Sequence, residues 1–202
     1  MSIQIGHVLI FVGALSSGLG GVLLWLQSNA ALIKAKEEII EKDEYILSHV
    51  TGGNGFCYLD IGSISGDGNS GTWVVNNGGD YTVYDVQVDI INLATITQIT
   101  PDSTLQQMLS MRDIVELGNI PPHTARMLID PIDLSNQEEL KFNIFVVARN
   151  GFTVQHLRMI RIENKWFHAT RVLKRKGDSD ITLFEEVDDN YPKDENGNVN
   201  WD

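Results

Sequence analysis

The 202-residue sequence has little cysteine and, over long stretches, little positive charge. Its single cysteine excludes a disulfide-stapled scaffold, a cysteine-rich zinc module and a CxxC redox motif. The formal net charge is −12, from 15 Lys and Arg against 27 Asp and Glu, which argues against nucleic acid as the main partner. Charged residues make up an ordinary 21% of the chain, so global disorder is not expected. The length is that of one globular domain with an added segment.

Charge is absent from the N-terminal part of the chain, because residues 1–33 contain no Asp, Glu, Lys or Arg. Residues 8–26 are apolar or glycine except for two adjacent serines, whose hydroxyls can bond back to the preceding turn of a helix. A helix of about 20 apolar residues crosses the roughly 30 Å hydrocarbon core of a bilayer. Trp25 stands where an interfacial aromatic residue is expected. The sequence therefore predicts a transmembrane helix at residues 1–27.

The residues that flank this segment predict its orientation and leave one alternative open. Lys34, Lys36 and Lys42 follow the apolar run, and no Lys or Arg precedes it. By the positive-inside rule, we expect a single-pass membrane protein with its C-terminal domain in the cytoplasm. A cleaved signal peptide is the alternative, since residues 28–30 are compatible with a small-residue cleavage site, although the apolar core is long for one.

Two patterns in the N-terminal part predict association with a second copy of the chain. Gly13, Ser17 and Gly21 fall four residues apart, a spacing that lets two membrane helices approach closely. Residues 28–50 are predicted to form a helical stalk in which pairs of aliphatic residues recur every seven residues. This stalk fits a short coiled coil, and equally a single amphipathic helix on the membrane or on its own domain. The pairs are Leu32 with Ile33, Ile39 with Ile40, and Ile46 with Leu47.

Residues 51–176 change to an alternation of period two, which predicts a mainly β domain. Many short strands separated by turn clusters, without alternating helices, favour an antiparallel β-sandwich or a barrel. Asn150 and Gly151 suit a type I′ turn, in which both residues need a positive φ. A short helix is expected at residues 103–111, and residues 177–202 are expected to form an acidic, largely disordered tail. The predicted strands are 56–61, 72–76, 82–93, 114–117, 124–129, 140–149, 152–162, 165–173 and 182–186.

Three stretches of this domain resemble bacterial immunoglobulin-like sandwich domains of the cell-adhesion-related type. They are residues 75–79 (VNNGG), the alternating strand at residues 83–91, and residues 115–124 (VELGNIPPHT). The sequence departs from the family pattern at His123, where the family usually carries glycine after the prolines. The resemblance covers about 50 of the 202 residues and implies an immunoglobulin-like fold that binds, spaces or docks, without a shared catalytic residue. It also implies an extracellular location, which opposes the orientation inferred above.

The sequence contains few catalytic or metal-binding patterns, so we predict a non-enzymatic protein without a cofactor or a metal. Residues 62–66 read GSISG and lack the central serine of a nucleophile elbow. Cys57 lies in an apolar strand and is expected to pack as a small hydrophobe. His156 and His168 are predicted to face opposite sides of one hairpin, too far apart to share a metal. Two acidic, glycine-containing loops lack the full calcium-loop spacing. These loops are residues 66–71 and 194–198.

The distribution of charge is the most informative feature of the C-terminal half. Residues 141–176 carry nine Lys and Arg and one acid, whereas residues 177–202 carry one Lys and nine acids. The basic block is either a solvated strand face, a surface along which the acidic tail lies, or a docking surface for an anionic ligand, an anionic lipid surface or an acidic protein. Trp166 is predicted to lie opposite Arg161 and to stack on it. The predicted docking residues are Arg149, Arg158, Arg161, Arg171, Lys174, Arg175 and Lys176.

Together these patterns predict a membrane-anchored, non-catalytic binding or scaffolding module that acts at the membrane surface. Its expected partners are the lipid bilayer, a second copy of the chain, and an anionic ligand or an acidic protein. The alternative is a membrane-tethered sensor whose β domain binds a small anionic ligand. A sensor predicts arginines that converge on a pocket, whereas a scaffold predicts arginines that are spread over a flat face.

Overall fold

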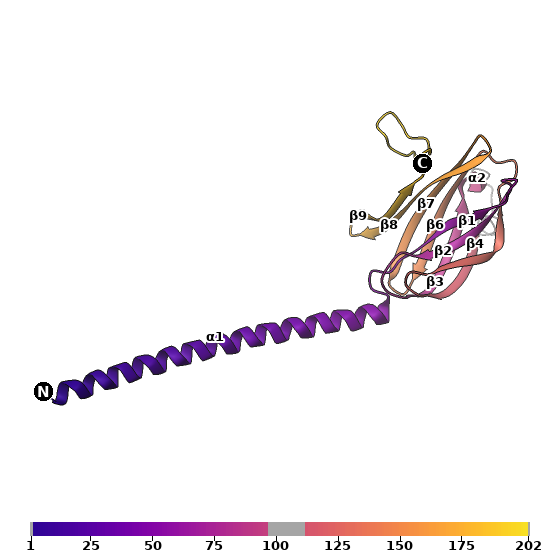
Figure 1. Cartoon of the computed structure of the whole chain (residues 1–202). Coiled ribbons are helices and arrows are strands. Elements are labelled where there is room, and N and C mark those ends of the chain that lie inside the picture. The colour runs from indigo at the N-terminus through magenta and orange to yellow at the C-terminus, as the bar shows by residue number, and fades with distance from the viewer. Residues whose placement is uncertain (1, 97–111, 202) are drawn as a thin grey trace. The chain divides into compact units, whose positions relative to one another are not determined.

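The computed structural model describes the backbone of residues 2–96 and 112–201 (Figure 1), and the side chains of residues 25–95 and 112–201. The chain divides into two compact units, Met1–Leu47 and Ser48–Asp202. The helix predicted at residues 103–111 lies outside the described residues.

One long helix, α1 (Ser2–Thr51), runs through the residues predicted as membrane span and stalk. It ends where Gly52 and Gly53 adopt positive φ values of 98° and 48°, which glycine reaches without steric cost. Within the described part of the chain, no helix is long and apolar enough to cross a membrane. The side chains of residues 8–24 lie outside the described residues, and so do the predicted association residues Gly13, Ser17 and Gly21.

The stalk part of α1 presents its heptad pairs to solvent. All six aliphatic side chains of these pairs are exposed, by 48–65% of their surface. The helix predicted over residues 28–50 is confirmed. No described residue of the first unit covers its apolar stripe. The six residues are Leu32, Ile33, Ile39, Ile40, Ile46 and Leu47.

The second unit is built from antiparallel strands, and each of the nine predicted strands is confirmed. A three-stranded sheet has the order β1-β2-β5, and a six-stranded sheet has the order β4-β3-β6-β7-β8-β9. A short helix, α2 (Leu93–Ile96), follows the third strand. The strands are β1 (Cys57–Ile64), β2 (Ser70–Asn77), β3 (Val83–Asn92), β4 (Arg112–Ile120), β5 (Ala125–Asp133), β6 (Glu139–Ala148), β7 (Gly151–Ile162), β8 (Lys165–Lys176) and β9 (Ser179–Val187).

One apolar core draws on both sheets. Trp73 of β2 meets Phe142 of β6 edge to face, with ring centroids 5.2 Å apart. Val86 and Val88 of β3 are fully buried, as their alternation with polar residues predicts. Each side chain of this size contributes about 1.5–3 kcal/mol when it is fully buried.

A buried amide also links the two sheets. Gln155 of β7 accepts a hydrogen bond from the Leu59 amide of β1 at 2.8 Å and donates one to the Leu59 carbonyl at 2.6 Å. It donates a further bond to the Thr170 hydroxyl at 2.8 Å. Because β1 is an edge strand, Gln155 satisfies backbone groups that strand pairing leaves open.

The stretches that carry the immunoglobulin-like resemblance meet at Asn77. Its buried side-chain amide donates to the carbonyl groups of Ile120 and Pro121, at 3.0 and 3.1 Å. It donates as well to the Tyr81 carbonyl at 2.9 Å. His123 adopts a φ of 52°, a conformation that glycine reaches most easily, at the position where the family usually has glycine.

The prediction of a type I′ turn at Asn150 and Gly151 is wrong. Gly151 pairs with Ala148, so that Arg149 and Asn150 form the loop, and of these turn residues only Gly151 has a positive φ. The physical reason is a tertiary contact. The Asn150 side-chain amide donates to the Gly55 carbonyl at 2.6 Å and thereby fixes the segment that precedes β1 against this loop.

The geometry predicted for that turn occurs instead in the next hairpin. Glu163 and Asn164 connect β7 to β8 and have φ values of 50° and 62°. This turn fixes the predicted register, in which Arg161 lies opposite Trp166. The Arg161 guanidinium lies 5.9 Å from the centroid of the indole ring, so the predicted contact is confirmed.

The prediction that residues 177–202 are largely disordered is wrong for β9, which pairs with β8 over eight residue pairs. Without β9, the last strand of the six-stranded sheet would leave its backbone donors and acceptors open, and pairing satisfies them. Residues 188–201 contain no strand, and a backbone bond from Tyr191 to Asp188 forms a turn in them.

Candidate binding site on the outer sheet face

The face of the six-stranded sheet opposite the core is called here the outer face. Buried Gln155 and Leu157 of β7 point into the core, so His156 and Arg158, which alternate with them, lie on the outer face. The β7–β8 register sets His156 opposite Arg171. It thus confirms the pairing predicted from the sequence.

Arg158 is only 2% exposed, although it lies on the outer face. Its guanidinium donates to the Phe142 carbonyl at 2.6 Å, to the Leu157 carbonyl at 3.1 Å and to the Asn143 side-chain oxygen at 3.0 Å. The Trp201 carbonyl accepts two further bonds, from Nε at 3.0 Å and from one Nη atom. A buried guanidinium requires this degree of hydrogen bonding, because desolvation of a cation is costly.

Arg171 and His156 hold the Trp201 side chain. The Arg171 guanidinium lies 4.5 Å from the centroid of the indole ring, within the range of a cation–π contact. Arg171 Nε donates to His156 Nδ1 at 3.1 Å, and the His156 ring is 6.4 Å from that of Trp201. Trp201 is thus bound through both its carbonyl and its ring. We call His156, Arg158 and Arg171 the outer-face cluster.

The segment that carries Trp201, residues 188–201, has a second anchor at its start. Asp188 accepts a hydrogen bond from the His168 amide at 2.7 Å and lies 3.0 Å from His168 Nδ1. Burial and the Glu139 carboxylate raise the pKa of Tyr191, and Arg158 opposes that shift. Tyr191 therefore lies close enough to the outer-face cluster to respond to its charge.

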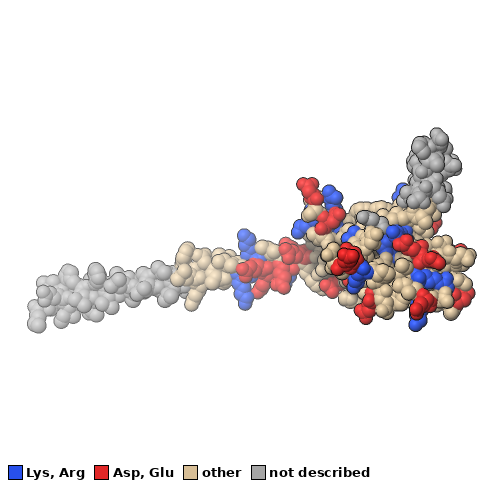
Figure 2. Space-filling model, turned by 90° about the horizontal axis from the view of Figure 1, so that it is seen from above, with Lys and Arg blue, Asp and Glu red and all other residues tan. Residues whose placement is uncertain are grey.

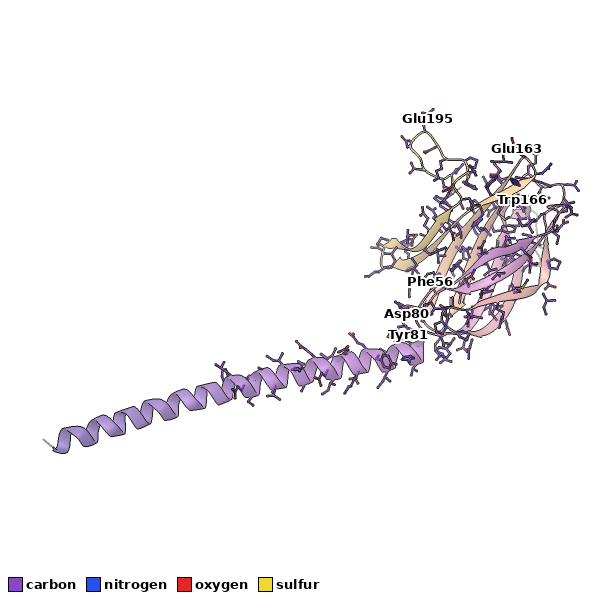
Figure 3. The ribbon with its side chains drawn as sticks, viewed as in Figure 1. Phe56, Asp80, Tyr81, Glu163, Trp166 and Glu195 are labelled. Carbon is purple, nitrogen blue, oxygen red and sulfur yellow. The ribbon has the colours of Figure 1, made fainter. Side chains whose placement is uncertain are left out.

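Between these anchors, the segment forms a self-contained loop, with Glu195 near its tip (Figure 3). The Asp194 carboxylate accepts from the amides of Asn196 and Asn198, at 2.9 and 2.8 Å. These backbone hydrogen bonds lower the pKa of Asp194. A shallow hollow of about 490 Å³ lies beside the segment and is lined by Arg171, Asp194, Val199, Asn200 and Trp201.

Two other predicted docking residues, Arg149 and Lys174, lie near the entry of the chain into the second unit. Arg149 forms an ion pair with Asp85 at 2.9 Å and donates to the Val50 carbonyl at 3.3 Å. Lys174 Nζ lies 3.5 Å from the Asn150 carbonyl. The remaining two residues are Arg175 and Lys176, which end β8.

Arg161, the seventh predicted docking residue, lies apart from both groups. It donates to the Asp67 carbonyl at 3.4 Å, and its partner Trp166 donates to the Gly68 carbonyl at 3.0 Å. Figure 3 places Trp166 at the end of the sheets that is opposite Phe56.

The predicted docking residues therefore do not converge on one pocket. Of the four arginines proposed for a ligand pocket, only Arg171 lines the hollow of about 490 Å³. A groove of about 870 Å³ between β4 and β5 has none of the seven predicted residues among its described lining residues. Figure 2 shows acidic and basic side chains mixed over the visible face of this unit. Such a spread is the arrangement that we expect of a scaffold.

The remaining chemical features have structural explanations. Burial raises the pKa of the Cys57 thiol to about 12, against a smaller opposing effect of Arg126. In the loop predicted to have some calcium-loop character, Asp67 accepts from the Ser65 hydroxyl and the Asn69 amide, which lower its pKa. Within the described residues, no group of three or more His, Cys, Asp or Glu is arranged to hold a metal.

Sequence reasoning missed His156 and Trp201 as members of the site. Trp201 lies 43 residues from Arg158 along the chain, and no local periodicity connects the two. The one signal available was an isolated tryptophan in an otherwise polar segment, a residue type that is rarely left in water. Comparison of the chain with protein-family models, with curated proteins and with solved structures finds no match.

Proposed function

We propose that the chain is a membrane-anchored, non-catalytic binding module whose outer sheet face docks an acidic protein partner. One observation carries the proposal: Arg158 and Arg171 hold Trp201, which belongs to an acidic segment. Residues 188–201 carry four acids and one lysine. The basic residues of the strands that carry Arg158 and Arg171 give this face the charge to attract an acidic segment of another protein.

The fold proposed for the binding domain is an immunoglobulin-like β-sandwich. Its support is the core shared by two antiparallel sheets, with Trp73 against Phe142, and the junction of the resembling stretches at Asn77. A sandwich leaves one face of each sheet available, so the outer face of the larger sheet is a natural docking surface.

The anchor proposed is the predicted transmembrane helix at residues 1–27, with the second unit in the cytoplasm. The uncharged first 33 residues and the lysines that follow them support this placement. Association of two copies through Gly13, Ser17 and Gly21 and through the stalk would place several docking faces side by side. Such multivalency strengthens weak individual contacts.

Fractionation of cells that express the full chain tests the anchor. We expect the protein in the membrane fraction after a high-salt wash, and its release only by detergent. Protease added to intact cells should spare the second unit and should digest it after permeabilisation. Recovery of the unprocessed chain without detergent would overturn the anchor, and digestion in intact cells would reverse its orientation.

Binding of poly-L-glutamate tests the acidic docking surface. The full chain in nanodiscs is compared with a chain that ends at Val187, in which the outer-face cluster is uncovered. We expect the shortened chain to bind the polyanion more tightly, by about tenfold at low salt, and to lose the gain when salt is raised. Equal binding by the two chains would contradict the proposal. Thermal unfolding of both chains checks that the fold is retained.

A further inference from the structure

We infer that the outer-face cluster is a recognition site for an acidic peptide that contains a tryptophan, and that residues 188–201 occupy it as an internal competitor. The inference rests on the proposed function and names the chemistry of the partner. Residues 188–201 then cover the cluster until an external peptide displaces them.

The ligand chemistry follows from what the cluster presents. Arg171 offers the face of a guanidinium to an indole ring, and Arg158 offers its donors to a backbone carbonyl. A tryptophan fills both needs, because its ring has the strongest attraction for a cation and its carbonyl is a strong acceptor. A peptide with acidic residues around the tryptophan adds attraction to the basic strands.

The burial of Arg158 shows that the outer face is covered at this position. Alternation along β7 directs this side chain away from the core, and yet only 2% of it is exposed. Ala169, its register partner on β8, is fully buried on the same face. Other residues of the chain therefore cover Arg158 and Ala169 on the outer face. Trp201 contacts Arg158 directly. Whatever replaces the segment must supply an acceptor to Arg158, because a buried guanidinium that lacks one bears the cost of its desolvation.

The way in which the segment is held permits exchange. It is bonded to the sheet at its two ends, through the backbone and carboxylate of Asp188 and through the carbonyl and ring of Trp201, and its described residues form no strand. Its central loop is closed by its own hydrogen bonds around Asp194, so the loop keeps its shape without the sheet. Release of Trp201 alone would uncover the cluster and leave β9 paired with β8.

The test uses the full chain in nanodiscs and a fluorescent peptide with the sequence of residues 188–202, followed by anisotropy. In the wild-type chain the internal segment competes, whereas Trp201→Ala removes the competing ring. We expect Trp201→Ala to bind the peptide about tenfold more tightly than the wild type does. Equal affinity of the two chains would overturn the inference.

Two further measurements separate the site from general charge. In the Trp201→Ala chain, Arg171→Ala should abolish the gain, whereas Lys165→Ala, at an exposed cation that begins the same strand, should leave it unchanged. A peptide whose tryptophan is replaced by alanine should bind no better than poly-L-glutamate. If poly-L-glutamate binds and the tryptophan gives no advantage, the recognition site is refuted while the acidic docking surface stands. If neither ligand binds, the docking function itself fails.

Discussion

At the scale of single residues, Gln155 shows how one polar side chain sets the relation of the two sheets. It is fully buried, and three of its hydrogen bonds reach Leu59 and Thr170. The Leu59 groups belong to an edge strand, and no strand partner is available for them on that side. An apolar residue at position 155 would therefore leave buried donors and acceptors unsatisfied.

We predict that Gln155→Leu lowers the free energy of unfolding by about 2–4 kcal/mol, measured by urea denaturation. Gln87→Leu is the matched control, because Gln87 lies exposed on β3 of the same sheet and should change stability by less than about 0.5 kcal/mol. A cost for Gln155→Leu no greater than that for the control would show that the buried amide does not join the sheets.

The raised pKa of Cys57 gives a prediction of reactivity and of pH dependence. With a pKa of about 12, the thiol stays protonated at pH 8, so the native chain should resist iodoacetamide until it is unfolded. The unfolded thiol loses its proton near its ordinary value of 9.0, whereas the folded thiol retains it. Stability should therefore fall between about pH 9 and pH 12.

Denaturation at pH 8 and at pH 10.5 measures this fall. Tyr58, whose pKa burial also raises, acts in the same direction above pH 10. The loss of stability that Cys57→Ala abolishes is the contribution of the thiol. If the variant and the wild type lose equal stability between the two pH values, Cys57 does not contribute.

At the scale of elements, the β7–β8 turn carries backbone strain. Glu163 adopts a φ of 50°, although residues with a Cβ other than Asn and Asp rarely do so. We predict that Glu163→Asn raises the free energy of unfolding by roughly 0.5 kcal/mol, because asparagine tolerates this conformation. Asn164→Ala, at a φ of 62°, should lower it. Thermal unfolding checks both variants, and a stabilised Asn164→Ala chain would refute the explanation.

The elements themselves are largely predictable from the sequence, because alternation of buried and exposed residues is a local property. Val86 and Val88 follow this alternation. The pairing of Arg161 with Trp166 is local as well, because the turn at Glu163 and Asn164 sets its register. The exceptions depend on distant contacts. Asn150 departs from the expected turn geometry because its amide reaches Gly55, 95 residues away.

The candidate site is less predictable than the fold for the same reason. The sequence identifies Arg158 and Arg171 as basic residues of neighbouring strands, but it gives no reason to separate them from Lys174 or Arg175. What separates them is the cover that Trp201 provides. That contact joins the last residues of the chain to the middle of a strand, and composition and periodicity carry no information about it.

At the scale of the whole molecule, the distribution of charge follows the order of the strands. The most basic part of the chain ends in β8, and the most acidic part begins in β9, which pairs with it. An ion pair joins the two strands, from Arg175 to Asp180 at 3.8 Å. Backbone pairing over eight residue pairs and the Trp201 contacts also hold the acidic part of the chain against the basic strands.

The exposed stripe of α1 leads to a prediction about assembly. Six aliphatic side chains in three heptad pairs face solvent over the stalk. Under the proposed membrane anchor, a second parallel copy in the same bilayer would present the same stripe at the same height. We predict that Ile40→Asn with Leu47→Asn lowers the fraction of oligomer in membranes several-fold, measured by stepwise photobleaching of labelled chains. Glu41→Gln with Glu44→Gln, which leaves the aliphatic pairs intact, is the control. An unchanged fraction of oligomer in the asparagine variant would contradict the prediction. The stripe would then contact the membrane or the chain's own β domain, and association would depend on Gly13, Ser17 and Gly21 alone.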